Sequence, residues 1–221
     1  MRGATHGNGK TLEQVTPQQL AEFLEHPKKA YDYWLADALD NPNLGPFLDK
    51  LAEQVKTLPP GFREQVEQVT GKMYSKMQER KWLHLVPKDP TPEPERKRFS
   101  LEKDWHVLHY ALNGTAEGGD GPLADAILGG EPIPDEEGVS DFGGIRYLSP
   151  QRVAAVAKAL VEVDPDQLVS RLDRADAEAK RIYLAHTLPQ EWEYLPELFR
   201  NFRKFYEDAA RSGNAMLLSI S

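Results

Sequence analysis

The chain has 221 residues, contains no cysteine, and carries 27 lysines and arginines against 35 aspartates and glutamates, a formal net charge of −8. Its length suffices to bury a core without disulfides or a structural metal, and the missing cysteines exclude thiolate catalysis and cysteine-ligated zinc or iron–sulfur sites. The acidic balance argues against a nucleic-acid partner, because a negative surface repels phosphate backbones.

Residues 1–9 are polar and glycine-rich and predict a flexible tail. Residues 10–16 then alternate roughly between polar and apolar side chains, which predicts a short strand. Thr16 and Pro17 predict the start of a helix, because threonine caps a helix N-terminus and proline fits the first helical position. A second helical pattern follows over residues 28–40.

Residues 40–86 carry apolar residues at helical spacings and predict two helices. These apolar stripes are too few for a separate domain, so we expect the helices to pack against the core of the rest of the chain. Residues 87–98 hold four prolines among mostly charged neighbours, which predicts an exposed connection. The chain is therefore predicted to be a single domain over residues 10–221, with a helical insertion at 40–86 and a proline-rich connection at 87–98.

In the second half of the chain, Ser100 is predicted to cap a helix that extends to Leu112. Residues 144–148 predict a strand. Ser149 and Pro150 again combine a capping residue with a proline at the first helical position, and so predict a further helix. Two shorter helical segments are expected between this helix and the C-terminal one.

Residues 195–209 place their large apolar side chains on one helical face, and Gly213 predicts the end of that helix. Residues 215–220 form an apolar run typical of a strand. A terminal strand needs a partner, and residues 10–16 or 144–148 can supply one. The sequence therefore predicts an α+β fold, in which the N-terminal, central and C-terminal strands form a small mixed or antiparallel sheet packed with several amphipathic helices.

Four segments, in the same order and spacing, resemble the YfbM-like family (domain of unknown function 1877). They are residues 100–109 (SLEKDWHVLH), 122–130 (PLADAILGG), 144–150 (GIRYLSP) and the ending 205–215. A weaker similarity covers residues 11–27. The resemblance implies a compact α+β fold and leaves the chemistry open, because the family is known as one of uncharacterised function.

His106 and His109 stand three apart on a predicted helix, so their rings share one face. Two imidazoles alone do not make a metal site, and the sequence indicates no third ligand; we therefore predict none. We expect His109 to be buried beside Trp105 with both nitrogens hydrogen-bonded, and His106 to be exposed. The glycines at 118–121 lack the Lys-Ser/Thr pair of a phosphate-binding loop, and no cofactor is predicted.

The alternative use of this region is a pocket for proton transfer or ligand contact. Asp104, His109 and Arg146 are the candidate catalytic residues, and Trp105 and Tyr147, their neighbours in the sequence, are the candidate ligand contacts. No complete catalytic set can be assembled from them. The sequence therefore favours a non-enzymatic domain that binds another protein, with an enzyme or small-ligand-binding protein as the alternative.

The sequence also bears on location. No apolar run approaches the roughly 20 residues that a membrane-spanning helix needs. The N-terminus has no apolar segment of the kind found in secretory signals. We therefore expect a cytoplasmic protein that does not associate with membranes; the sequence leaves its oligomeric state open.

Overall fold

A computed structural model of the chain describes residues 9–39, 49–50, 53–56, 61, 63–64, 67–68, 71, 75, 96–135 and 144–220. The chain divides into two compact units. The first comprises residues 1–25, 96–134 and 140–221, and the second comprises residues 26–95 and 135–139. The predicted tail at 1–9 and most of the predicted insertion at 40–86 and connection at 87–98 lie outside the described residues.

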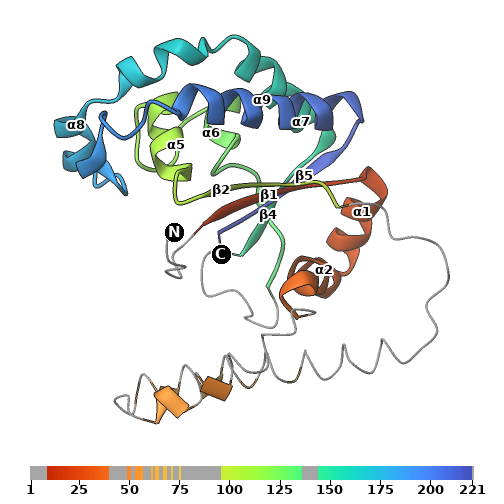
Figure 1. The fold of residues 1–221 in the computed structure, drawn as a ribbon. Coiled ribbons are helices and arrows are strands. Elements are labelled where there is room, and N and C mark those ends of the chain that lie inside the picture. The colour runs from red at the N-terminus through yellow and green to blue at the C-terminus, as the bar shows by residue number, and fades with distance from the viewer. Residues whose placement is uncertain are drawn as a thin grey trace. The chain divides into compact units, whose positions relative to one another are not determined.

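The first unit is built on one open sheet of five strands in the order β2-β1-β5-β4-β3 (Figure 1). Every pairing in it is antiparallel. The strands are β1 (Lys10–Val15), β2 (Arg98–Glu102), β3 (Glu131–Pro132), β4 (Ile145–Leu148) and β5 (Ala215–Ile220). The α+β prediction is confirmed.

The C-terminal strand β5 lies at the centre of the sheet. Along one side it pairs with β1, from Lys10 opposite Ile220 to Val15 opposite Ala215. Along the other side it pairs with β4, with Leu148 opposite Met216. The expectation that the terminal strand pairs with the N-terminal or the central strand is therefore confirmed, since it pairs with both. A central place satisfies its backbone groups on both sides.

The two edge strands, β2 and β3, were not expected from the sequence. The prediction that Ser100 caps a helix is wrong, because Ser100 lies within β2 and the helix begins at Trp105. In β2 the residue opposite Leu12 is Phe99. As a strand, this segment takes its backbone hydrogen bonds from β1. A helix would make these bonds within itself, and the local sequence does not reveal the distant partner.

Helices account for the remaining elements of the first unit. Their bounds are α1 (Pro17–Glu25), α5 (Trp105–Asn113), α6 (Pro122–Asp125), α7 (Pro150–Val161), α8 (Arg174–Ala179), α9 (Leu195–Arg211) and the short 3-10 turns η1 (Pro165–Gln167), η2 (Val169–Arg171) and η3 (Ala185–Thr187). Ser149 caps α7 as predicted, because its hydroxyl accepts a hydrogen bond from Arg152 N at 3.3 Å.

In the second unit, α2 (Pro27–Leu39) buries Ala30 and Tyr31.

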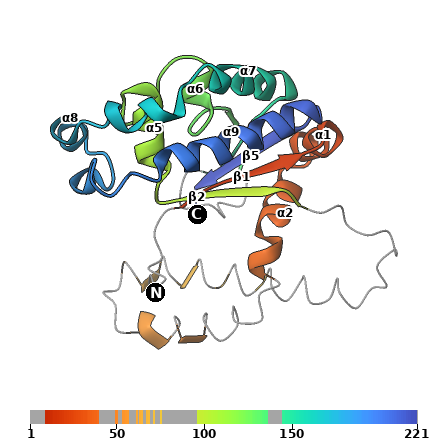
Figure 2. The same cartoon turned by 45° about the horizontal axis from the view of Figure 1, so that its top comes forward.

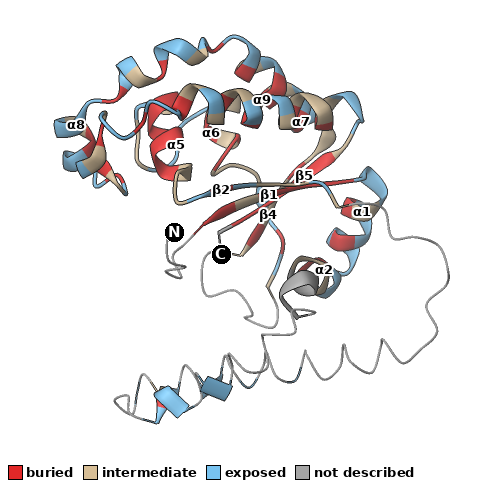
Figure 3. Ribbon diagram, in the orientation of Figure 1, coloured by how far each residue is buried: buried red, intermediate tan, exposed pale blue. Residues whose placement is uncertain are grey.

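The core of the first unit lies between one face of the sheet and helices α5, α6, α7 and α9 (Figures 1 and 2). The sheet contributes Leu12, Leu148, Met216 and Leu218 to this layer. The opposing helices supply most of the fully buried aromatic side chains; those of α9 are Phe199, Phe202 and Tyr206. Figure 3 shows the buried positions turned inward along these helices. The amphipathic pattern predicted for residues 195–209 is confirmed.

Candidate functional site

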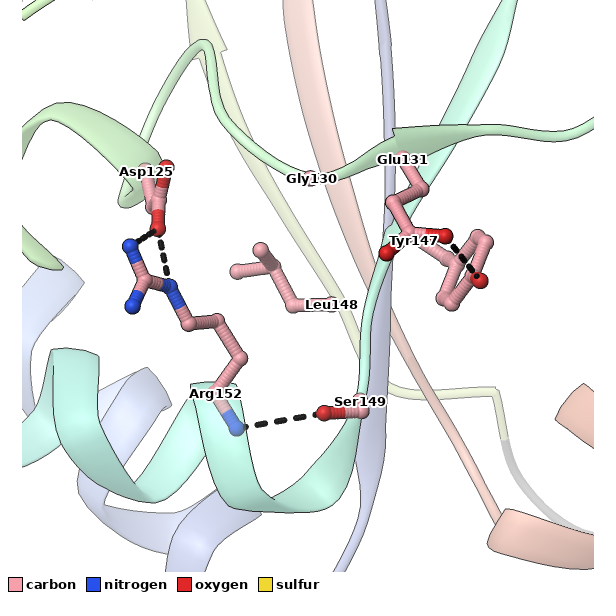
Figure 4. A pocket seen from close by; sticks show the side chains of 7 residues that line it. All are labelled: Asp125, Gly130, Glu131, Tyr147, Leu148, Ser149 and Arg152. Carbon is pink, nitrogen blue, oxygen red and sulfur yellow. Dashed lines mark hydrogen bonds and ion pairs between the residues drawn. The ribbon is translucent and has the colours of Figure 1, made fainter. Parts of the chain in front are cut away.

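A hollow of about 380 Å³ opens at the edge of the sheet, where β4 runs into α7 (Figure 4). β3 pairs with only Arg146 and Tyr147 of β4, so Leu148, the last residue of β4, has no described strand beside it on that side. The lining residues are Asp125, Gly130, Glu131, Tyr147, Leu148, Ser149 and Arg152. The hollow therefore forms where the short edge strand gives way to a turn.

One wall of the hollow is an ion pair. Arg152, in the first turn of α7, reaches the carboxylate of Asp125 at the end of α6 through both Nε and Nη2, which contact the same oxygen, Oδ2. The second terminal nitrogen of the guanidinium, Nη1, has no hydrogen-bond partner among the described residues. A donor in this wall is therefore available to a ligand.

The opposite wall is a tyrosine–carboxylate pair. Tyr147 and Glu131 lie opposite each other on β4 and β3, and the tyrosine hydroxyl donates to Glu131 Oε2 at 2.8 Å. This hydrogen bond is the largest of the causes that raise the pKa of Tyr147 above its ordinary value. Leu148 lies between the two walls in Figure 4 and gives the hollow an apolar floor.

Two glycines hold the hollow in shape. A Cβ on Gly130, whose φ is +90°, would lie 2.3 Å from the carbonyl oxygen of Tyr147. A Cβ on Gly129 would lie 2.1 Å from the Cα of Asp125. Both separations are far below contact distance, so only glycine allows this turn to press against β4 and α6. The turn thereby places Asp125 within reach of Arg152.

Arg146 of β4 also supports this turn. Its guanidinium donates to the carbonyl oxygen of Gly129 at 3.3 Å and to that of Gly130. Tyr147, a predicted ligand contact, therefore lines the hollow, and Arg146, a predicted catalytic residue, holds the backbone that bounds it. Sequence reasoning missed Asp125, Glu131 and Arg152, although Asp125 falls within one of the segments that carry the family resemblance.

The other predicted site residues lie around α5. Asp104 accepts a hydrogen bond from the hydroxyl of Tyr194 at 2.9 Å. Trp105 stacks on His106, with ring centroids 4.7 Å apart. Asp104 and Trp105 thus lie at the N-terminal end of α5 and do not line the hollow.

His106 is buried, and the prediction that it is exposed is wrong. Its Nε2 lies 2.9 Å from the carbonyl oxygen of Ala116, and its Nδ1 lies 3.0 Å from the backbone nitrogen of Tyr183. The ring therefore donates from Nε2 and accepts at Nδ1, which is the neutral form. Burial is the main reason that its pKa lies below the ordinary value for histidine.

His109 is wholly buried, as predicted. Its Nδ1 lies 3.4 Å from the side-chain nitrogen of Asn113, and Nε2 has no hydrogen bond of normal geometry within the described residues. The backbone of Gly118 is nevertheless close enough to the ring to act on its pKa, in the upward direction. Burial, followed by the electrostatic effect of His106, lowers the pKa of His109 to about 4. Among the described residues, no cluster of three or more histidine, aspartate or glutamate side chains is arranged to hold a metal ion.

Fold and hollow together define the class: an α+β protein with an open antiparallel sheet, helices α5, α6, α7 and α9 packed on one face of it, and a polar hollow at the sheet edge. The chain belongs to the family described as "Domain of unknown function (DUF1877)", whose sequence model matches residues 9–219. The resemblance stated from the sequence is confirmed. No helix in the described part of the chain has the length and apolar character required to cross a membrane.

Two comparisons involve one relative. Protein YfbM of Escherichia coli (strain K12) is 28% identical over 100 residues, which cover 44% of this chain and 58% of YfbM. The aligned stretch thus spans little more than half of the relative. The crystal structure of YfbM, titled a protein of unknown function, matches with a TM-score of 0.53 and 16% identity, over 96% of this chain and 99% of YfbM. The structural similarity extends the shared fold to almost the whole chain.

Proposed function

We propose that this protein binds a small zwitterion, of the size of an amino acid, in the hollow between β4 and α7. The carrying observation is the arrangement of two polar walls on either side of the Leu148 floor. Ligand sites combine an apolar surface with a few convergent polar groups, and their volumes run from about 300 to 1,000 Å³. The hollow lies at the small end of that range.

The two walls favour opposite charges on the ligand. Arg152 offers the unpaired Nη1 donor, and it stands in the first turn of α7, where the helix dipole favours an anion. Glu131 is exposed, and Tyr147 bonds to only one of its oxygens, so Oε1 remains available to a cation. A carboxylate against Arg152 and an ammonium against Glu131 satisfy both walls at once.

The experiment measures binding of a panel of free amino acids by isothermal titration calorimetry. Arg152→Met and Glu131→Gln are each expected to weaken binding roughly 10- to 100-fold, the value of one lost charge-assisted hydrogen bond. Arg171→Met, which changes an exposed arginine away from the hollow, is the matched control and should bind as the unchanged protein does.

An N-acetylated version of the same amino acid separates the two walls. It lacks the ammonium, so it should bind the unchanged protein more weakly and lose nothing further in Glu131→Gln. The proposal is wrong if no amino acid binds, or if the acetylated ligand and the free one respond equally to that substitution.

A second candidate function is binding of another protein, the interpretation that the sequence favours. The supporting observation is an aromatic surface at the N-terminal end of α5. Tyr183 and Tyr194 are 48% and 41% exposed. The backbone nitrogen of Tyr183 donates to His106, and the hydroxyl of Tyr194 donates to Asp104. The half-buried Trp105 lies between these two residues in the sequence and stacks on His106. Exposed tyrosines and tryptophans are the residues that most often carry binding energy in protein interfaces.

The test compares proteins captured from lysate by the unchanged chain, by Tyr183→Ala/Tyr194→Ala, and by Leu24→Ala/Val161→Ala. The last variant alters exposed apolar residues elsewhere, of 42% and 50% exposure. A partner that uses the aromatic surface is retained by the control variant and lost from the tyrosine variant. A captured protein that both variants retain contradicts this candidate. The net charge of −8 supports a partner other than nucleic acid.

A further inference from the structure

His106 joins α5 to a strained segment of the chain that follows α8. Its Nδ1 accepts a hydrogen bond from the backbone nitrogen of Tyr183 at 3.0 Å. Arg181 and Leu184, which lie on either side of Tyr183, have left-handed backbones with φ of +58° and +66°. Residues other than glycine disfavour this conformation, which persists only where the surrounding structure holds it in place. The contact with His106 is therefore one of the restraints on this segment.

Buried residues fix the segment before and after the contact with His106. Ile182 and Ala185 are 4% and 5% exposed and belong to the core. Between them, the backbone of Tyr183 is held by the His106 ring, while the tyrosine side chain is about half exposed. Loss of this hydrogen bond would therefore free Tyr183 and Leu184 first and leave the two core residues in place.

The two hydrogen bonds of His106 require a neutral ring. The backbone nitrogen of Tyr183 can only donate, so Nδ1 must carry a lone pair. The carbonyl oxygen of Ala116, 2.9 Å from Nε2, can only accept, so Nε2 must carry the proton. A second proton has only Nδ1 to bind, where it would point at the N–H of Tyr183. Protonation of the ring and the hydrogen bond to Tyr183 therefore exclude each other.

We propose that His106 is a pH-sensitive switch, in which a proton on Nδ1 releases the backbone of Tyr183 and lets Tyr183 and Leu184 leave the strained turn. The hydrogen bond to Ala116 is kept, because the protonated ring still donates from Nε2. Tyr183 belongs to the aromatic surface at the N-terminal end of α5, so the switch alters that surface in acid. The switch does not rest on either proposed function, because it concerns only the backbone of this segment.

Several titratable groups surround the ring. Glu117, in the loop after α5, favours the charged form of His106, but burial outweighs it and keeps the pKa of His106 below its ordinary value of 6.5. His109, one turn along α5, has a pKa of about 4 and stays neutral until the solution is more acidic. Asp104, just before α5, accepts from a tyrosine hydroxyl. Arg181, on the strained segment, is exposed to solvent.

The direction of the pH effect follows from the lowered pKa of His106. In the released segment the ring regains its ordinary pKa, so below pH 6.5 the released form binds the proton and the closed form does not. The closed form is therefore fully stable above pH 6.5 and loses stability as the pH falls. Release should become up to about tenfold more favourable for each pH unit below that value.

The experiment measures hydrogen exchange of the Tyr183 amide by NMR from pH 8 to pH 5, as protection relative to an unstructured chain at the same pH. Protection should be constant above about pH 6.5 and fall by up to about tenfold per pH unit below it. The amide of Val153 in α7, which donates to the carbonyl oxygen of Ser149, is the internal control and should keep its protection.

His106→Gln retains a group that can donate and accept but does not titrate, so the protection of Tyr183 should no longer depend on pH. His186→Gln, which removes an exposed histidine from η3, is the matched control and should respond as the unchanged protein does. The proposal is overturned if Tyr183 keeps its protection down to pH 5, if Val153 loses protection equally, or if the pH effect survives in His106→Gln. The two amides of the unchanged protein decide the matter even if His106→Gln does not fold.

Discussion

At the scale of single residues, His106 ties together three parts of the chain. It joins α5 to the loop at Ala116 and to the backbone of Tyr183, and it stacks on Trp105. We expect His106→Phe to keep the stacking and lose both hydrogen bonds. The free energy of unfolding should therefore fall by roughly 1–3 kcal/mol, because a part-buried donor and a part-buried acceptor lose their partner.

Chemical denaturation of this variant measures the loss. The matched control is His186→Phe, which makes the same substitution at an exposed histidine in η3 and should change stability by no more than about 0.5 kcal/mol. Equal losses from both variants would mean that the two hydrogen bonds of His106 contribute little to the fold.

The pH dependence of stability reports on Lys10. Burial, and then the charge of Arg146, lowers its pKa from 10.5 to about 7 in the folded protein. Between these two values the unfolded chain binds the proton and the folded chain does not, so stability rises with pH. His109 on α5, whose pKa is lowered to about 4 in part by Lys10, is neutral over this range.

We therefore compare the unchanged protein with Lys10→Met by urea denaturation at pH 7, 8 and 9 in buffers free of phosphate and carboxylate. As the pH rises, the unfolding free energy of the unchanged protein should increase relative to that of Lys10→Met, by up to about 1.4 kcal/mol per pH unit. Parallel pH profiles for the two proteins would show that Lys10 keeps its proton on folding.

At the scale of elements, β2 is held at the sheet edge by charge as well as by backbone pairing. Glu13 of β1 is fully buried and accepts from Arg96 Nε at 2.5 Å and from Arg98 Nε at 2.7 Å. Glu13→Gln removes the anion between two arginines. We expect it to cost roughly 3–5 kcal/mol, the usual loss when one partner of a buried ion pair is removed.

Thermal and urea unfolding measure this effect, with Glu197→Gln as the matched control. Glu197 lies 3.7 Å from Arg200, and its side chain is 69% exposed, so solvent screens the pair and the change should cost less than about 1 kcal/mol. A loss at Glu13 no larger than that at Glu197 would contradict a structural role for the buried carboxylate.

At the scale of the whole molecule, the sheet depends on segments that are far apart in the chain. The central strand β5 pairs with β1 and β4, and the edge strand β2 follows the segment 40–86. We expect residues 40–86 not to fold alone, because their apolar residues are too few for an independent core. A protein of these residues should melt without a cooperative transition in circular dichroism. A sharp transition in that fragment would show that the segment is a domain.

Much of the fold could be predicted because the signals are local. Helices α7 and α9 and strands β1, β4 and β5 each carry their own period of apolar residues, with caps or glycine at their ends. The edge strands could not be predicted in this way. The partners of β2, which are strand β1 and the Glu13 carboxylate, lie some 85 positions away in the chain.

For the candidate site too, local signals could be predicted and long-range contacts could not. The sequence by itself determined that Tyr147 and Arg146 lie on a strand and that Ser149 begins a helix, because periodicity and capping act between near neighbours. Only the tertiary structure decided that Arg152 meets Asp125, and that Lys10 faces the layer occupied by His109. Those meetings depend on strand order and register, which are determined by the burial of the whole core and not by any local pattern.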